Sequence, residues 1–176
     1  MPRLFVAIRP PAAIREALLG ACSGIEGARW QDDDQLHLTL AFCGDVDGAK
    51  AEDLADALAE VESMAFMAEV AGVGHFEHKR SPTAVWAALP LSEPLGQLHG
   101  RVGRACRRAG IATEKRAFRP HITLARLPRS ARPIGGWLAE HGTLRAGPWE
   151  VTGFTLYESH LRPEGSLYLP LVDYEF

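Results

Sequence analysis

The chain has 176 residues, of which 47% are hydrophobic and 23% are charged, and its formal net charge is −3. This composition is typical of a soluble globular protein and excludes disordered and fibrous classes, and the length suffices for one domain or two closely joined lobes. No apolar run approaches the roughly 20 residues that a membrane-spanning helix needs. The apolar stretch Leu4–Ile8 is too short for the apolar region of a signal peptide, so it predicts a buried first strand and no secretory leader.

The sequence contains three cysteines, Cys22, Cys43 and Cys106. Their odd number and the lack of CxxC spacing argue against a disulfide framework, and free thiols fit a reducing, cytoplasmic location. Nothing near them in the sequence lowers a thiol pKa. We therefore expect each to be a small buried apolar side chain rather than a nucleophile.

Charge is distributed unevenly along the chain. The N-terminal part carries the acidic run Asp32-Asp33-Asp34, whereas one later segment is strongly basic. Ten of the nineteen Lys and Arg residues fall within this basic segment: Arg101, Arg104, Arg107, Arg108, Lys115, Arg116, Arg119, Arg126, Arg129 and Arg132. A locally basic face on an acidic protein suits a confined phosphate-bearing ligand better than extensive wrapping of nucleic acid. A solvated basic helix explains the same pattern equally well.

In chain order, strand-like runs alternate with amphipathic helices, which are identified by the spacing of their apolar residues. The predictions for the first half are a strand at Leu4–Ile8, a helix opened by Pro10-Pro11 with Ile14, Leu18 and Cys22 on one stripe, a strand at Leu36–Phe42, a helix from Ala49 to Ser63, and strands at 65–71 and 84–89. The polar residues 74–83 between the last two strands predict a loop.

The second half continues this alternation. The predictions are a helix from the N-cap Ser92 through about Ala109 with Gly110 ending it, a strand at His121–Ala125, a short helix near Trp137–Glu140, and final strands at about Trp149–Glu158 and Leu167–Glu175. This order predicts an α+β fold with two βαβ-containing halves rather than a regular doubly wound sheet.

The pattern His-x-Thr-Leu occurs three times, at His37–Leu40, His121–Leu124 and His141–Leu144. So short a pattern needs its structural context to be informative. The third copy follows helical residues, and Gly142 is typical of a helix C-terminus, so we interpret His141 as a helix-end histidine without a functional role.

The first two copies lie in alternating strands. Residues i and i+2 of a strand point to the same face. One face is therefore expected to carry His37, Thr39 and Ala41, with Leu38, Leu40 and Phe42 in the core. The second strand repeats this arrangement, with His121, Thr123 and Ala125 on the polar face and Ile122 and Leu124 in the core. The alternative is two unrelated strands that turn polar residues toward solvent.

Two opposed imidazoles suit the opening of a cyclic phosphodiester. One neutral histidine can take a proton from water while one protonated histidine protonates the departing ribose oxygen. In-line attack places these two groups on opposite sides of phosphorus. The hydroxyls of Thr39 and Thr123 can hydrogen-bond the non-bridging oxygens. This chemistry requires no metal or other cofactor.

The sequence resembles the 2H phosphoesterase superfamily and, within it, the bacterial and archaeal RNA 2′,3′-cyclic phosphodiesterases, historically called 2′-5′ RNA ligases (LigT-like). The resemblance runs nearly end to end. The matching segments are Arg3 to Pro11, Leu36 to Gly44, Gly72 to Phe76, Val85-Trp86, Arg116 to Arg126, Leu156 to Leu161 and Gly165 to Tyr168.

The resemblance implies a single domain over residues 1–176, made of two interleaved lobes. Its fold would be α+β and bilobal with pseudo-twofold symmetry, with two mainly antiparallel sheets flanked by helices around a central cleft. It implies hydrolysis of RNA 2′,3′-cyclic phosphate ends to 2′-phosphates. By analogy, His37 would be the general acid that protonates the departing 3′ oxygen, and His121 the general base. The sequence itself is symmetric in the two histidines.

Further site residues follow from the same comparison. Arg126 matches a family arginine, but its offset of five from His121 would turn it away from the pocket unless the strand ends or bulges near Ala125. Phe42 and Phe118 are candidates for stacking on a base, with core packing as the alternative that we favour. Where the family often has Arg after the proline at 82, this chain has Thr83, and Lys79 or Arg80 would have to substitute.

Alternatives remain open at this point. His75-Phe76-Glu77-His78 has a spacing that permits a metal site, but we favour loop histidines because HExxH and further ligands are lacking. Besides hydrolysis, the same site would suit reversible 2′-5′ RNA ligation, or a non-catalytic module that binds RNA ends or nucleotides. The substrate would be RNA with a 2′,3′-cyclic phosphate or a small cyclic nucleotide. We expect a monomer that needs no membrane.

Overall fold

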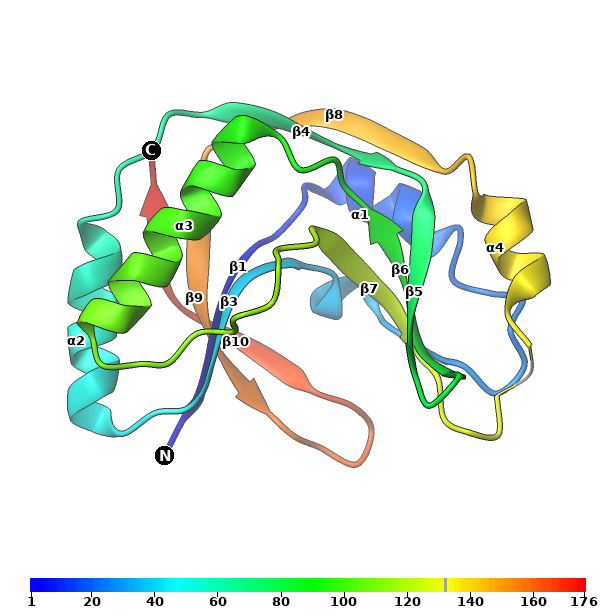
Figure 1. The fold of residues 1–176 in the computed structure, drawn as a ribbon, viewed down its shortest axis with the longest axis horizontal. Helices are drawn as coiled ribbons and strands as arrows, with labels where there is room; N and C mark the ends of the chain where they lie inside the picture. Colours follow the sequence, from blue (N-terminus) through cyan, green and yellow to red (C-terminus); the bar gives the residue numbers. More distant parts are fainter. Residues whose placement is uncertain (132) are drawn as a thin grey trace.

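The computed structural model describes residues 1–131 and 133–176 (Figure 1), so Arg132 of the basic segment lies outside the described residues. The strands are β1 (Arg3–Ile8), β2 (Arg29–Trp30), β3 (Leu38–Asp45), β4 (Phe66–Ala71), β5 (Val73–His78), β6 (Ser81–Ala88), β7 (His121–Arg126), β8 (Arg145–Val151), β9 (Gly153–His160) and β10 (Leu167–Glu175). The helices are α1 (Ala12–Leu19), α2 (Gly48–Ala59), α3 (Glu93–Arg108) and α4 (Gly135–His141), with a 3₁₀ turn, η1, at Asp33–Gln35.

Within the described ranges the strands form one eight-stranded sheet and one two-stranded sheet, both antiparallel. The large sheet has the order β10-β9-β1-β3-β7-β6-β5, with β2 pairing β7, and the small sheet pairs β4 with β8. Figure 1 shows α2 and α3 together at one end of the molecule and α4 at the other, with the small sheet along one side. The predicted α+β class with antiparallel sheets is confirmed.

The hydrophobic core lies between one face of the large sheet and the helices. The buried stripe of α3 includes Leu95, Leu98 and Val102, and α2 contributes Leu54 and Leu58. These side chains pack with the inward residues of β1, β3 and β7 in one continuous cluster. The other face of the large sheet carries a separate small cluster of Phe5, Ala7, Tyr157 and Tyr168. The sheet thus has a core face and an aromatic face.

The helices follow the sequence pattern closely. The hydroxyl of Ser92 accepts a hydrogen bond from the Leu95 amide and caps α3, and Gly110 follows the helix with a φ of 77°. Two predicted helices are too long, because α1 ends at Leu19, before Cys22, and α2 ends at Ala59 rather than Ser63. None of the helices in residues 1–131 and 133–176 is long and apolar enough to cross a bilayer.

Two predictions of strand boundaries are wrong. The polar segment 74–83 is not a loop, because β5 and β6 extend through it and turn at Lys79 and Arg80, which both have positive φ. β5 is the edge strand of the large sheet, so it tolerates polar residues that resemble a loop composition. The predicted strand at 149–158 is two strands that join different sheets, with Thr152 between them.

Candidate active site

The two His-x-Thr strands meet at the middle of the large sheet. Among the described residues, β3 and β7 share one bridge pair, Leu38 with Ile122. Both side chains are buried in the core, so the residues on either side of them point to the opposite face. Because the strands are antiparallel, this crossing places His37 on the side of Thr123, and Thr39 on the side of His121. The four predicted side chains therefore share the aromatic face of the sheet.

A β-bulge lies at the last residue of each motif. Where β3 pairs with β1, Leu40 is the extra residue between Thr39 and Ala41, and where β7 pairs with β6, Leu124 is the extra residue between Thr123 and Ala125. An inserted residue reverses the alternation of side chains beyond it. Each bulge thus changes which residues face the site.

The bulges correct the expected faces. Ala41 and Ala125 were expected beside the histidines, but they are 9% and 0% exposed and belong to the core. Phe42 was expected in the core, but it is 44% exposed and lies opposite Phe5 of β1 on the aromatic face. A regular period of two fails here because it takes no account of an inserted residue.

The bulge in β7 also changes the face of the sheet to which Arg126 points. It follows the bulge of β7, is exposed, and faces the side that carries His121 and Thr123. Its positive charge lowers the pKa of both His37 and His121, which places it within electrostatic reach of the two imidazoles. From the sequence, Arg126 could face the pocket only if the strand ended or bulged near Ala125. The bulge at Leu124 meets this condition.

Each site histidine is oriented by a backbone carbonyl two residues earlier. Nδ1 of His37 lies 2.7 Å from the carbonyl oxygen of Gln35, and Nδ1 of His121 lies 2.7 Å from that of Arg119. A carbonyl only accepts, so each Nδ1 must carry the proton it donates. The neutral rings therefore keep Nε2 unprotonated and free to accept a proton. The two imidazoles are thus oriented in the same way.

Each imidazole also contacts two aromatic rings, which contact each other. The ring centroid of His37 is 4.9 Å from that of Phe5 and 5.1 Å from that of Tyr168. The corresponding rings at His121 are Phe76 at 4.9 Å and Trp86 at 5.4 Å. Strand patterns did not single out these four aromatics, although all of them fall within the segments that carry the family resemblance. They come from four strands, so only the tertiary structure gathers them.

Hydrogen bonds connect η1, the turn that precedes His37, to distant parts of the chain. The Gln35 side chain donates to the carbonyl of Ser166, which lies just before β10 and Tyr168. Asp33 accepts a hydrogen bond from Arg15 of α1 at 2.9 Å. The acidic run at 32–34 therefore fixes the turn whose Gln35 carbonyl orients His37.

The site of His121 rests on close packing between β5 and β6. A Cβ added at Gly74 would come within 2.6 Å of three carbons of the Trp86 ring, so the ring lies directly against this glycine. The Trp86 Nε1–H is buried without a hydrogen-bond partner among the described residues. Its position is thus set by ring packing, against Gly74 on one strand and His121 on another.

Burial is the main influence on the titration of both histidines. The pKa of His37 is lowered to about 4, mainly by desolvation; the hydrogen bond with the Gln35 carbonyl opposes this shift, and the charges of Arg126 and His121 add to it. Desolvation is also the largest of the causes that lower the pKa of His121. Both imidazoles are therefore neutral at pH 7. An anion between them favours protonation of one ring, as a general acid requires.

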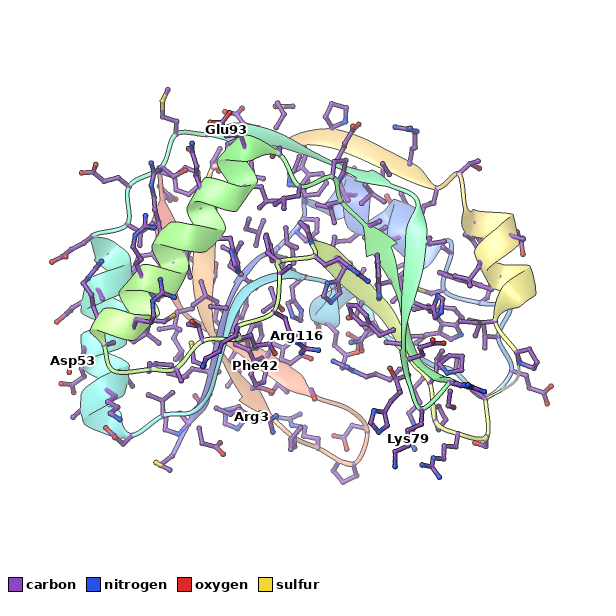
Figure 2. All side chains as sticks on the ribbon, in the orientation of Figure 1. Arg3, Phe42, Asp53, Lys79, Glu93 and Arg116 are labelled. Atoms are coloured by element: carbon purple, nitrogen blue, oxygen red, sulfur yellow. The ribbon has the colours of Figure 1, made fainter. Side chains whose placement is uncertain are left out.

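The two aromatic candidates lie in different surroundings. The Phe42 ring is exposed, with the Arg3 guanidinium 5.4 Å from its centroid, and Figure 2 shows both residues close to the β1–β3 ladder. Phe118 is half-buried against the core and stacks on His99 of α3, with centroids 3.9 Å apart. The core packing that we favoured for both thus holds for Phe118 and is wrong for Phe42.

The remaining histidines of interest lie elsewhere. His141 ends α4 and packs against Trp137, with 5.0 Å between ring centroids, as expected of a helix-end histidine. His75 lies on β5 rather than in a loop, and its Nε2 is 3.8 Å from a Glu77 carboxylate oxygen. In the part of the chain that the structure describes, no three His, Cys, Asp or Glu side chains are grouped to hold a metal. Lys79, labelled in Figure 2, lies with Arg80 at the tip of the β5–β6 hairpin, whereas His121 pairs with Ala88 at the far end of β6.

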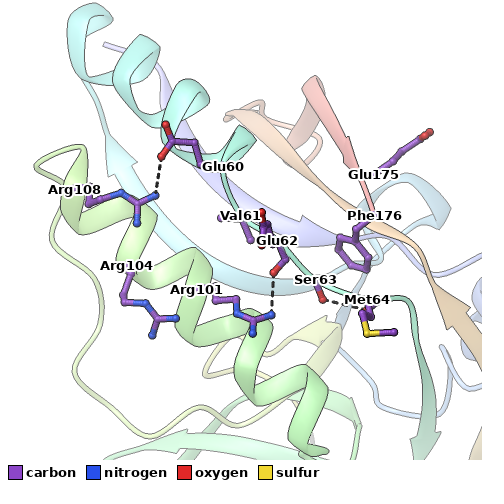
Figure 3. Close-up of a pocket in the computed structure, with 10 residues that line it drawn as sticks. All are labelled: Glu60, Val61, Glu62, Ser63, Met64, Arg101, Arg104, Arg108, Glu175 and Phe176. Carbon is purple, nitrogen blue, oxygen red and sulfur yellow. Dashed lines mark hydrogen bonds and ion pairs between the residues drawn. The ribbon is translucent and has the colours of Figure 1, made fainter.

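The basic segment is divided between several surfaces. Arg101, Arg104 and Arg108 of α3 line a hollow of about 740 Å³ (Figure 3). Neither His37 nor His121 lines this hollow. Acidic residues share this hollow, where Arg108 lies 3.8 Å from Glu60 and Arg101 donates to the Glu62 carbonyl. The charge of these arginines is thus partly balanced locally. Two other members of the segment act on the site, because Arg126 lowers the pKa of both histidines and Arg119 lowers that of His121.

Comparison with known proteins agrees with this arrangement. The sequence model of the 2′-5′ RNA ligase superfamily matches residues 8–162. The chain is 31% identical to the RNA 2′,3′-cyclic phosphodiesterase of Archaeoglobus fulgidus, over 98% of this chain and 99% of the relative. It is 32% identical to the protein of that name from Escherichia coli, over 96% and 93% of the two chains.

Solved structures show the same fold. The crystal structure of a Thermus thermophilus protein matches with a TM-score of 0.81 at 28% identity, over 98% of this chain and 97% of the other. Escherichia coli LigT complexed with 3′-AMP matches with a TM-score of 0.79 at 29% identity, over 99% and 97%. The paired motifs, their shared face and the end-to-end similarity agree, and the chain belongs to the 2′-5′ RNA ligase superfamily.

Proposed function

We propose that this protein is an RNA 2′,3′-cyclic phosphodiesterase that hydrolyses the cyclic phosphate at an RNA or nucleotide end to a 2′-phosphate. The observation that carries the proposal is the equivalent presentation of His37 and His121. Both donate from Nδ1 to a carbonyl and leave Nε2 free. His37 immediately precedes β3 and His121 begins the adjoining β7, and both lie on the same face of the sheet. The names of the relatives that span nearly the whole chain support the same activity.

In the proposed reaction, His121 acts as general base and takes a proton from water, which attacks phosphorus. His37, protonated once the anionic substrate is bound, donates its proton to the departing 3′ oxygen. Thr39 and Thr123 donate hydrogen bonds to the non-bridging oxygens, and Arg126 compensates their charge. Phe42 offers an exposed ring for base stacking. Phe118 is a weaker candidate for stacking, because His99 covers one of its faces.

We further propose a cytoplasmic monomer that uses its own side chains without a metal or organic cofactor. Free cysteines support the cytoplasmic location. The 3′-AMP in the structure of Escherichia coli LigT supports a ribonucleotide phosphate as the ligand.

The decisive experiment is incubation of the protein with an RNA oligonucleotide that ends in a 2′,3′-cyclic phosphate, followed by separation of the products. We expect release of a 2′-phosphate end, an activity that persists in excess EDTA. His37→Ala and His121→Ala should each reduce it by about 100- to 10,000-fold, the usual contribution of acid–base catalysis. His141→Ala is the matched control, because it alters the third His-x-Thr-Leu copy without touching the site. If the substrate remained unchanged, the proposed hydrolysis would be wrong, and the alternative of a non-catalytic binding module would remain.

The family description favours one second candidate, reversible 2′-5′ RNA ligation. In that reaction a 5′-hydroxyl of another RNA replaces water at the same phosphorus. Adding an RNA with a free 5′-hydroxyl to the assay distinguishes the two activities, since ligation gives a longer product and hydrolysis does not.

A further inference from the structure

Two of the three cysteines face each other across the packing of α3 on β3. The Sγ atoms of Cys43 and Cys106 are 3.9 Å apart, a sulfur–sulfur contact between residues 63 positions apart in the chain. Cys106 belongs to the buried stripe of α3 and is 0% exposed, whereas Cys43 is only partly buried. Neither thiol takes part in the proposed hydrolysis.

The backbone of β3 directs Cys43 toward the helix. In the pairing of β3 with β1, Phe42 faces Phe5 and Gly44 faces Leu4, so Cys43 is the extra residue of a second bulge. Neighbouring residues of a strand point to opposite faces, and this holds for Phe42 and Cys43. Phe42 stays on the aromatic face while its neighbour approaches Cys106 on the other side.

The two thiols affect each other's ionisation. The hydrogen bond with Cys43 lowers the pKa of Cys106 against the raising effect of burial, and the nearby charge of Arg107 adds to the lowering. The same hydrogen bond and burial raise the pKa of Cys43. Cys22 differs, because burial raises its pKa to about 11 and its thiol donates to the Leu18 carbonyl instead of a second sulfur. The chain therefore contains one thiol pair and one isolated thiol for comparison.

We propose that Cys43 and Cys106 form an oxidative modification site, which hydrogen peroxide converts into an intramolecular disulfide between β3 and α3. The thiolate of Cys106 attacks one peroxide oxygen, the O–O bond breaks, and a sulfenic acid and hydroxide form. Cys43 then loses its proton and attacks the Cys106 sulfur, and the hydroxyl group leaves. Two thiols are oxidised, peroxide gains two electrons, and two water molecules are released.

The step requires a modest movement. The sulfur atoms must approach from 3.9 Å to the roughly 2.05 Å of a disulfide bond. The partly exposed Cys43 gives the small oxidant access to the pair. The bond would link α3 to the residue next to Phe42, at the exposed end of the proposed nucleotide site. The modification itself does not depend on the proposed hydrolytic activity.

The test uses the whole reduced protein, treated with hydrogen peroxide, denatured, and alkylated with N-ethylmaleimide. All three thiols are free at the start. We expect the treated protein to carry a single alkyl group, on Cys22, and non-reducing digestion to yield a peptide pair joined through Cys43 and Cys106. Dithiothreitol should restore three alkylation sites.

Variants make the result specific. Cys43→Ala and Cys106→Ala keep a small apolar side chain and should each abolish the cross-linked peptide, while Cys22→Ala should leave it unchanged. Alkylation of all three cysteines after peroxide treatment would overturn the proposal. So would sulfinic acid on one cysteine, or a disulfide between two molecules, in place of the internal bond.

Discussion

Leu38 and Ile122 pair across β3 and β7, and each is the second residue of a His-x-Thr-Leu motif. Because both are buried, the pair anchors the two strands in the core and turns His37, Thr39, His121 and Thr123 to the opposite face. The approximate twofold axis that relates the two motifs thus passes through an apolar contact. The catalytic proposal depends on this contact being held in register, and five predictions follow from the surrounding geometry.

The division of labour between the histidines can be tested with the leaving group. A cyclic phosphate analogue with an activated leaving group needs no general acid, so it should restore much of the activity lost in His37→Ala and little of that lost in His121→Ala. The measurement is the rate for each variant on both substrates. If His121→Ala is the rescued variant, the acid and base roles are reversed.

The threonine hydroxyls should contribute mainly in the transition state. Thr39→Val and Thr123→Val keep the shape of the side chain and remove the hydrogen bond to a non-bridging oxygen. Each should lower kcat by about 10- to 1,000-fold with a smaller change in KM. Thr39→Ser and Thr123→Ser retain the hydroxyl and serve as controls. An effect of the valine variants confined to KM would contradict a role in charge stabilisation.

Arg126 should influence the pH dependence as well as the rate. Its charge lowers the pKa of both histidines, so Arg126→Met should raise both pKa values. The pH profile of kcat/KM should move to higher pH, in addition to a loss of activity. Arg126→Lys keeps the charge and should keep the profile near its original position. A profile that does not move in Arg126→Met would place the arginine too far from the imidazoles.

Gly74 should be required for the position of Trp86. Gly74→Ala forces its Cβ against the Trp86 ring, which packs on His121. We expect destabilisation of about 1–3 kcal/mol, as for other overpacked sites, together with reduced kcat. The measurements are urea unfolding and the rate. Trp86→Phe in the Gly74→Ala background removes ring atoms at the contact and should recover part of the lost stability; if it does not, the contact is not the cause.

Burial of neutral His37 should make stability fall in acid. Its folded pKa of about 4 lies below the unfolded value of 6.5, so between these pH values the unfolded chain binds more protons. Stability is thus fully present above pH 6.5 and is lost as the pH falls toward 4, by at most about 3 kcal/mol from this group. The measurement is the free energy of unfolding in urea at about pH 7 and at about pH 4.5. This free energy should differ less between the two pH values in His37→Asn than in the unmodified protein. Equal differences would mean that His37 is not desolvated.

Much of the fold and the centre of the site could be predicted from the sequence. The apolar spacing and the Ser92 cap located α3 because local hydrogen bonding and burial of one helix face are properties of a short segment. The alternation in the two His-x-Thr strands predicted that His37 and Thr39 share a face, as do His121 and Thr123. Helix context also separated His141 from the two site histidines.

Other features depended on neighbouring strands. The bulges at Leu40 and Leu124 arise from pairing with β1 and β6, and they reversed the expected positions of Phe42 and Ala41 and brought Arg126 to the site. The rings around the histidines, the Gln35–Ser166 hydrogen bond and the contact between Cys43 and Cys106 join residues far apart in the chain. The sequence by itself determined which side chains can perform the chemistry, because periodicity and residue type are local. Only the tertiary structure decided what surrounds them, because strand register and long-range packing are set by the whole chain.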